Sequence, residues 1–119
     1  MKIKIIFFDI DNVICKTIGN EYKKNISIKK NITKINKIYN SGFYVKLFTA
    51  RFMGRSKENM KLAKKRGYEM TKKQLKKWDV KYHELIFGKP SFDLFVDDKS
   101  LSFKKTWADD ILKVLKLNK

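Results

Sequence analysis

The sequence predicts an α/β fold, a Rossmann-like three-layer sandwich with a mainly parallel sheet. Short apolar runs rich in β-branched and aromatic residues, which are typical of buried strands, alternate with stretches whose apolar residues recur at helical spacing. That alternation is typical of parallel strands joined by crossover helices. With 119 residues, of which 43% are hydrophobic, the chain is expected to form a single domain over residues 1–119.

Two strands and one helix are expected in the first half of the chain. Residues 3–8 are short, β-branched and aromatic, which predicts the first strand, and a polar loop follows over residues 12–27. Isoleucines then recur at helical spacing over residues 28–39, so a helix is expected there. The second strand is predicted over residues 43–48.

The second half is expected to contain short helices and two further strands. A helical turn is predicted over residues 60–63, and Gly67 would end or bend it. The segment Thr71-Lys72-Lys73-Gln74 fits a capping box, which would open another short helix that runs through Trp78. The remaining elements are strands over residues 84–87 and 94–96 and a terminal helix that carries Trp107, Ile111, Val114 and Leu115.

The net charge of +17 is the extreme feature of the composition. It reflects either the lysine-rich codon usage of an AT-rich genome or attraction to anions such as phosphates, nucleic acid or an acidic membrane surface. Cys15 is the only cysteine, so no disulfide within the chain is expected. No apolar run is long enough to span a bilayer and no signal peptide is visible, so a cytoplasmic location is expected.

Residues suited to chemistry follow each predicted strand. They are Asp9 and Asp11, then Thr49, then Lys89, then Asp97 and Asp98. Because the carboxyl ends of parallel strands open on one edge of a sheet, these side chains are expected around one cleft. Two carboxylates of like charge need a compensating cation or a shared proton. Magnesium together with a phosphate would satisfy that need.

These segments resemble the four motifs of the haloacid dehalogenase superfamily of phosphohydrolases. The motifs are Phe-Asp-Ile-Asp-Asn-Val at residues 8–13, Leu-Phe-Thr at 47–49, Lys89, and Phe-Val-Asp-Asp at 95–98. The resemblance covers nearly the whole chain in the right order. The longer strings at residues 48–51, 87–90 and 96–99 are similar to small phosphatase-like proteins linked to capsule or surface-polysaccharide synthesis.

This resemblance implies a role for each acid. Asp9 would attack phosphorus and form an aspartyl-phosphate. Asp11 would protonate the leaving oxygen and then deprotonate the attacking water, and its main-chain carbonyl would face the magnesium. Thr49 would donate a hydrogen bond to a phosphoryl oxygen, and Lys89 would offset the charge shared by the acids and the phosphate.

Metal and substrate contacts are expected from an overlapping set of residues. The expected magnesium ligands are Asp9, Asp11, Asp97 and Asp98, with Asp98 preferred over Asp97 for direct coordination. The expected substrate contacts are Thr49, Ala50, Arg51 and Lys89. Arg51 would bind a second anionic group of the substrate, or else it is a solvated or structural residue.

The chain departs from many relatives in two respects. Asn12-Val13 replaces the usual Gly-Thr, but asparagine tolerates a left-handed backbone, so the turn is expected to survive. Residues 12–27 and 52–82 are too short for a cap domain, so an open active site is expected. Either the substrate is large, or neighbouring subunits of a homo-oligomer close the site.

The resemblance therefore implies a magnesium-dependent phosphomonoester hydrolase that acts on a sugar phosphate in polysaccharide biosynthesis. One alternative is a phosphatase of nucleotides or polynucleotide ends, which the positive charge favours. Another is a non-catalytic module that binds anions or nucleic acid. The same acids would also serve a phosphotransferase.

Overall fold

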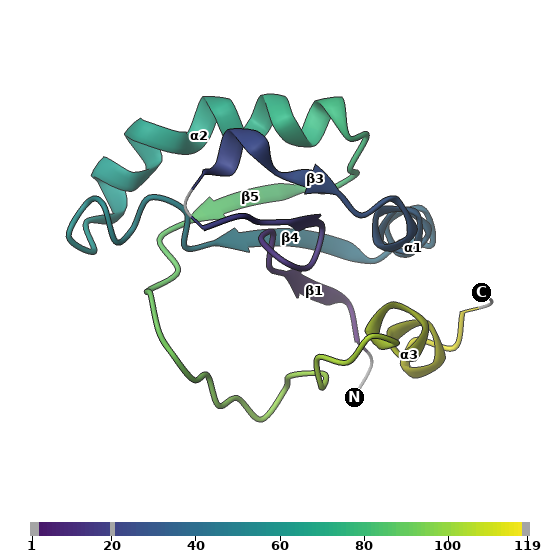
Figure 1. Ribbon diagram of the computed structural model, residues 1–119. Helices are drawn as coiled ribbons and strands as arrows, with labels where there is room; N and C mark the ends of the chain where they lie inside the picture. Colours follow the sequence, from purple (N-terminus) through teal and green to yellow (C-terminus); the bar gives the residue numbers. More distant parts are fainter. Residues whose placement is uncertain (1–2, 20, 118–119) are drawn as a thin grey trace.

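A computed structural model describes residues 3–19 and 21–117 of the chain. Its centre is a parallel three-stranded sheet in the order β1-β4-β5 (Figure 1). The strands are β1 (Ile5–Phe8), β4 (Tyr44–Thr49) and β5 (Glu84–Phe87), and the helices are α1 (Lys29–Asn40), α2 (Met60–Lys77) and α3 (Trp107–Val114). The predicted α/β class with a parallel sheet is confirmed.

One face of the sheet carries the core. The strand register places Leu47 between Phe8 and Leu85, so alternate residues of the three strands share that face. The isoleucines that predicted the first helix, Ile32, Ile35 and Ile38, are buried in α1 and join the same hydrophobic cluster. Right-handed crossovers that advance in one direction across a sheet place their helices on the same face. This accounts for α1 and α2 lying on the same face of the sheet.

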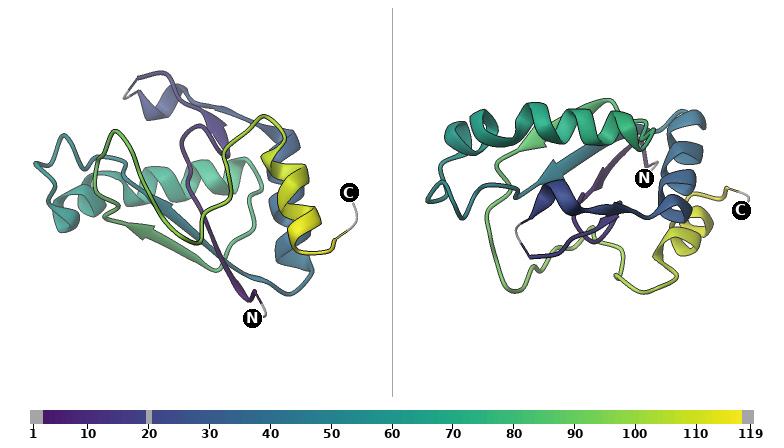
Figure 2. Two further views of the ribbon diagram at one scale, coloured as in Figure 1. Left: turned by 90° about the horizontal axis from the view of Figure 1, so that it is seen from below. Right: turned by 45° about the horizontal axis from the view of Figure 1, so that its top comes forward.

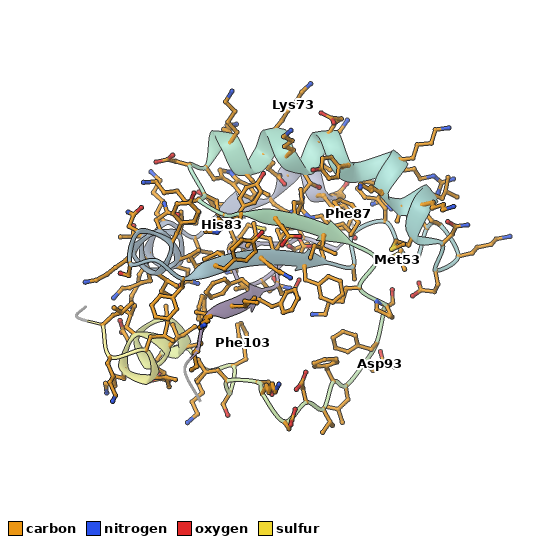
Figure 3. The ribbon with its side chains drawn as sticks, turned by 180° about the vertical axis from the view of Figure 1, so that it is seen from behind. Met53, Lys73, His83, Phe87, Asp93 and Phe103 are labelled. Carbon is orange, nitrogen blue, oxygen red and sulfur yellow. The ribbon has the colours of Figure 1, made fainter. Side chains whose placement is uncertain are left out.

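The opposite face of the sheet is open. Ile5, Phe7 and Tyr44 are 55%, 56% and 38% exposed there, and no helix crosses the sheet in the view from behind (Figure 3). The prediction of a three-layer sandwich is therefore wrong for the described part of the chain, which has two layers. A third layer would need a helix after β5, and the chain there runs on as an irregular segment.

The polar loop predicted over residues 12–27 contains short structure of its own. Strands β2 (Cys15–Lys16) and β3 (Ile26–Ser27) pair antiparallel, and the 3-10 turn η1 (Tyr22–Lys24) lies between them. The left view of Figure 2 shows this hairpin projecting from the rest of the fold. The backbone of Asn12 has a φ of 66°, as expected from the tolerance of asparagine for that conformation.

The α2 helix is one continuous element, and the prediction of two pieces is wrong. Its N-cap is Asn59, whose side chain accepts a hydrogen bond from the Leu62 N–H at 3.1 Å. Gly67 is buried inside the helix, where a glycine costs about 1 kcal/mol relative to alanine. Thr71 is also buried inside it, so the predicted capping box does not begin a helix. Tertiary packing has overridden both local signals.

The strand predicted over residues 94–96 does not form. Leu94 and Val96 are 83% and 88% exposed, and the chain between β5 and α3 follows a wide arc without regular structure (Figure 1). A strand needs a neighbour for its backbone groups, and this arc pairs with none of the described strands. The predicted terminal helix forms as α3, in which Trp107 and Ile111 are buried as expected, whereas Val114 is exposed. Among the described residues, no helix has the length and apolar character needed to cross a membrane.

Candidate active site

A cavity of about 540 Å³ opens at the carboxyl ends of the three parallel strands. Its walls come from the loops after β1, β4 and β5 and from the projecting hairpin. The lining residues are Asp9, Asp11, Asn12, Thr17, Gly19, Tyr22, Ala50, Arg51, Phe52, Gly54, Arg55, Lys89, Pro90, Ser91 and Phe92. Ligands of open α/β sheets bind in such a crevice, so this cavity is the candidate site.

Asp9 stands at the first residue after β1 and faces the cavity. Its Oδ1 accepts a hydrogen bond from the Ile10 N–H at 2.8 Å, and its Oδ2 lies 3.3 Å from the Lys89 Nζ. Burial raises the pKa of Asp9 above its ordinary value of 3.8, while the charge of Lys89 and the Ile10 hydrogen bond act in the opposite direction. The carboxylate is thus fixed at one oxygen and faces an ammonium at the other.

Lys89 reaches Asp9 from the far strand of the sheet. It follows Gly88, whose φ of 104° turns the chain after β5, and its own N–H donates to the Thr49 carbonyl at 3.2 Å. The loop beyond it is held by Glu58, whose carboxylate accepts the Ser91 N–H at 2.9 Å. The position of the Lys89 ammonium is therefore set by contacts with the end of β4 and with the loop that precedes α2.

Asp11 is the most heavily hydrogen-bonded acid of the site. Its Oδ1 accepts from the Thr17 hydroxyl at 2.8 Å and from the Asn25 Nδ2 at 3.0 Å. The Arg51 guanidinium adds a forked contact, with its Nη2 2.9 Å from Oδ1 and its Nε 3.1 Å from each oxygen. The Asp11 side chain remains 20% exposed, and the residue lines the cavity.

Arg51 differs from the expectation that it contacts the substrate. Its side chain is 0% exposed and ion-paired with Asp11. Of the two roles considered from the sequence, the arrangement favours the structural one. Arg51 is among the residues that line the cavity, but its guanidinium is fully buried and its N–H groups already have acceptors in the protein, so none is free to donate to a second anionic group of a substrate.

Thr49 also differs from its expected role. The residue is fully buried at the end of β4, and its hydroxyl accepts a hydrogen bond from the Arg51 N–H at 3.0 Å. It is absent from the lining of the cavity in the described part of the chain, whereas its neighbour Ala50 lines it. The geometry therefore gives Thr49 the task of shaping the loop after β4.

The second acidic pair is not brought to the site. Asp97 and Asp98 are exposed on the arc between β5 and α3, and the Asp97 carboxylate accepts a hydrogen bond from the Lys99 N–H at 2.8 Å. Within residues 3–19 and 21–117, no group of three or more acidic, histidine or cysteine side chains is placed to hold a metal ion. The four expected magnesium ligands therefore do not form one set in this arrangement.

Cys15 is buried in the core, and His83 is exposed but stacks on two tyrosine rings. Burial and the charge of Asp11 raise the pKa of the Cys15 thiol, which disfavours the reactive thiolate. His83 stacks on Tyr39 and Tyr44 with ring centroids 4.5 Å and 4.4 Å apart, and its Nδ1 accepts the Val45 N–H at 3.0 Å. Neither residue is therefore placed to act as a nucleophile or a metal ligand.

Sequence reasoning missed an aromatic wall of the cavity. The rings of Tyr22 and Phe52 lie 5.0 Å apart, and the Arg55 guanidinium lies 5.3 Å and 4.8 Å from their centroids. The position of Phe52 three residues after the strand end could have indicated it. Nothing local could have indicated Tyr22, which reaches the cavity from the projecting hairpin.

Comparison with known proteins identifies a solved structure with the same fold. No family model matches the chain, and no curated protein matches it significantly. A crystal structure of an MCSG target from Vibrio cholerae matches with a TM-score of 0.78 at 19% identity, over 94% of this chain and 98% of that chain. Likeness at this identity shows the fold alone. The chain therefore shares its α/β fold, over nearly its whole length, with that Vibrio cholerae protein.

Proposed function

We propose that this protein hydrolyses phosphate monoesters through an aspartyl-phosphate formed on Asp9. The observation that carries the proposal is the placement of the Asp9 carboxylate at a cavity, 3.3 Å from the Lys89 ammonium and two residues from the firmly held Asp11. A carboxylate that faces a cation at the end of a parallel strand can accept a phosphoryl group, because the cation offsets the added negative charge.

The proposed reaction has two steps. In the first, an oxygen of Asp9 bonds to phosphorus while the bond from phosphorus to the alkoxy oxygen breaks, and protonated Asp11 gives its proton to that oxygen. In the second, ionised Asp11 takes a proton from water, the water oxygen bonds to phosphorus, and Asp9 is released as a carboxylate. The products are an alcohol and inorganic phosphate, and both aspartates return to their starting states.

Magnesium dependence is part of the proposal and rests on the resemblance seen in the sequence. Bound magnesium would supply charge stabilisation at the phosphoryl oxygens. The described arrangement fits that ion only in part, since Asp9 and Asp11 lie at the cavity while Asp97 and Asp98 are exposed on the arc. Direct coordination by either of the latter requires the arc to move toward β1.

The proposed substrate class is a phosphorylated sugar. The cavity of about 540 Å³ accommodates a small phosphorylated molecule, and the Tyr22 and Phe52 rings offer a wall for its leaving group. A role in polysaccharide biosynthesis remains an extension of the sequence resemblance, because fold alone does not determine substrate.

The decisive test compares Asp9→Asn with the wild type. Phosphate release is measured from sugar phosphates, nucleotides and phosphorylated oligonucleotides, with magnesium and with a chelator. Loss of the nucleophile is expected to lower kcat by ~10³-fold or more and to abolish acid-stable labelling of the protein by the phosphoryl group.

Asp93→Asn is the matched control, since Asp93 is an exposed acid on the arc between β5 and α3 (Figure 3). It should retain full activity. A folded wild-type protein that releases phosphate from none of these substrates would refute the proposal. A preference for the oligonucleotides would make polynucleotide ends, and not sugar phosphates, the proposed substrate class.

A further inference from the structure

We propose that Arg51 is a positioning residue that aims one oxygen of Asp11, Oδ2, at the leaving group, and that it does not bind substrate. This inference rests on the proposed function, because it assigns a task within that reaction. It is carried by the hydrogen bonds of a single buried guanidinium.

Every N–H group of the Arg51 side chain has an acceptor within the protein. The Nε donates to both oxygens of Asp11, and the Nη2 donates to Asp11 Oδ1 at 2.9 Å and to Cys15 Sγ at 3.7 Å. The Nη1 donates to Thr71 Oγ1 at 3.2 Å and to Gln74 Oε1 at 2.6 Å. A guanidinium has five N–H donors. None is left for an anion of the substrate.

The contact is braced from three separate segments. Thr71 and Gln74 belong to α2, and the Gln74 Nε2 in turn donates to the Tyr22 carbonyl at 2.7 Å. The Tyr22 ring lies 4.9 Å from the Arg51 Cζ. The guanidinium is thus clamped between α2, the projecting hairpin and the turn after β1. Forked arginine–carboxylate pairs fix orientation as well as distance.

The two oxygens of Asp11 are left in different states. Oδ1 accepts from Thr17, Asn25 and Arg51, which uses its capacity. Among hydrogen bonds between described residues, Oδ2 accepts only from the Arg51 Nε, at 3.1 Å. Since Asp11 lines the cavity, Oδ2 is the oxygen available to exchange a proton with the leaving group and then with water. Arg51 sets the direction of that oxygen.

The test exploits leaving groups of different basicity. A nitrophenolate departs readily without a proton, whereas an alkoxide needs one, so misplacing a general acid harms alkyl phosphates more. Arg51→Lys keeps the charge but removes the fork. It is expected to lower kcat by ~10²-fold on glycerol phosphate and by less than ~10-fold on p-nitrophenyl phosphate, with KM little changed. Asp11→Asn should show the same selectivity, and the double variant should lose no more.

Two other outcomes would overturn the inference. A rise in KM for fructose bisphosphate with kcat unchanged would make Arg51 a substrate contact. Equal losses of kcat on both monophosphates would make it merely structural. A wild-type protein inactive on every phosphate ester would refute the proposed function instead.

A milder variant guards against misfolding of Arg51→Lys. Gln74 is only half-buried, so Gln74→Met removes one brace while leaving the pair with Asp11 intact. It is expected to lower kcat a few-fold on glycerol phosphate and to leave p-nitrophenyl phosphate unaffected. If Arg51→Lys fails to fold, as judged by near-UV circular dichroism, absence of this selective loss in folded Gln74→Met counts against the inference.

Discussion

At the residue scale, opposing influences act on the carboxylate of Asp9. Burial is the largest and raises its pKa, Lys89 lowers it, and the nearby charge of Asp11 raises it again, with a net rise above 3.8. A raised pKa means that the folded protein holds this proton more tightly than the unfolded chain does. The resulting stability is present below 3.8 and is lost as pH rises through the pKa of the folded state.

Asp9→Asn is therefore expected to stabilise the fold at neutral pH. Asparagine is a neutral isostere, so it avoids the cost of burying the charge, although it gives up the ion pair with Lys89. The thermal midpoint of the variant should exceed that of the wild type by a few degrees at neutral pH, and the gap should close in acid. Scanning calorimetry across pH measures this. A gap that widens toward acid would show that the Lys89 pair dominates, and Asp93→Asn should track the wild type throughout.

At the element scale, the packing of α2 against the loop after β4 depends on Gly67. A Cβ at this position would meet the Phe52 ring, with Cε2 at 2.5 Å, and the Phe87 Cε2 at 3.1 Å. Phe87 is buried, and the half-buried Phe52 ring contacts both Tyr22 and Arg55, so a shift of either ring would disturb existing contacts. The glycine thus permits close approach of the helix to the loop that walls the cavity.

Gly67→Ala is expected to destabilise the protein despite the better helix propensity of alanine. Overpacking costs ~1–3 kcal/mol, which matches or exceeds the gain of about 1 kcal/mol from propensity. Urea denaturation should show a lower free energy of unfolding. Gly54→Ala is the control, because nothing lies within 4 Å of its Cβ position, and it should be nearly neutral. A more stable Gly67→Ala would show that the Phe52 loop yields freely.

At the scale of the whole molecule, the chain leaves one large segment unpacked. The arc between β5 and α3 exposes Leu94, Phe95 and Val96, and β1 exposes Ile5 and Phe7 on the open face of the sheet. The arc also carries both acids expected to complete the magnesium site. Metal binding under the proposed function is therefore coupled to where this segment lies.

Limited proteolysis should report that coupling. Trypsin is expected to cut first after Lys99, Lys104 or Lys105, which are exposed on the arc. If Asp98 joins Asp9 at the ion, magnesium with inorganic phosphate should slow these cuts several-fold. The ion would then bind more tightly when the arc lies near the site, and it would favour that position of the arc. Asp98→Asn should abolish the protection. Equal cutting rates with and without magnesium, measured by mass spectrometry, would exclude Asp98 as a ligand.

Strand ends could be predicted from the sequence because their signals are local. A β-branched run followed at once by Asp9, or by Gly88-Lys89, needs only neighbouring residues to be recognised, and these side chains do meet at one cavity. The burial of Arg51 could not be predicted. Its partners Asp11 and Gln74 lie 40 and 23 residues away, and only the packing of α2 against the loop after β4 brings them together.

The sequence by itself determined the α/β class, the parallel strands, the buried face of α1 and the placement of Asp9 and Lys89, since periodicity and strand-end position are properties of short segments. Only the tertiary structure decided that α2 is continuous, that the sheet has one open face, that residues 94–96 form no strand and that Arg51 faces Asp11. Each of those outcomes depends on which distant segment supplies a packing or hydrogen-bonding partner, and local propensity contains no information about that partner.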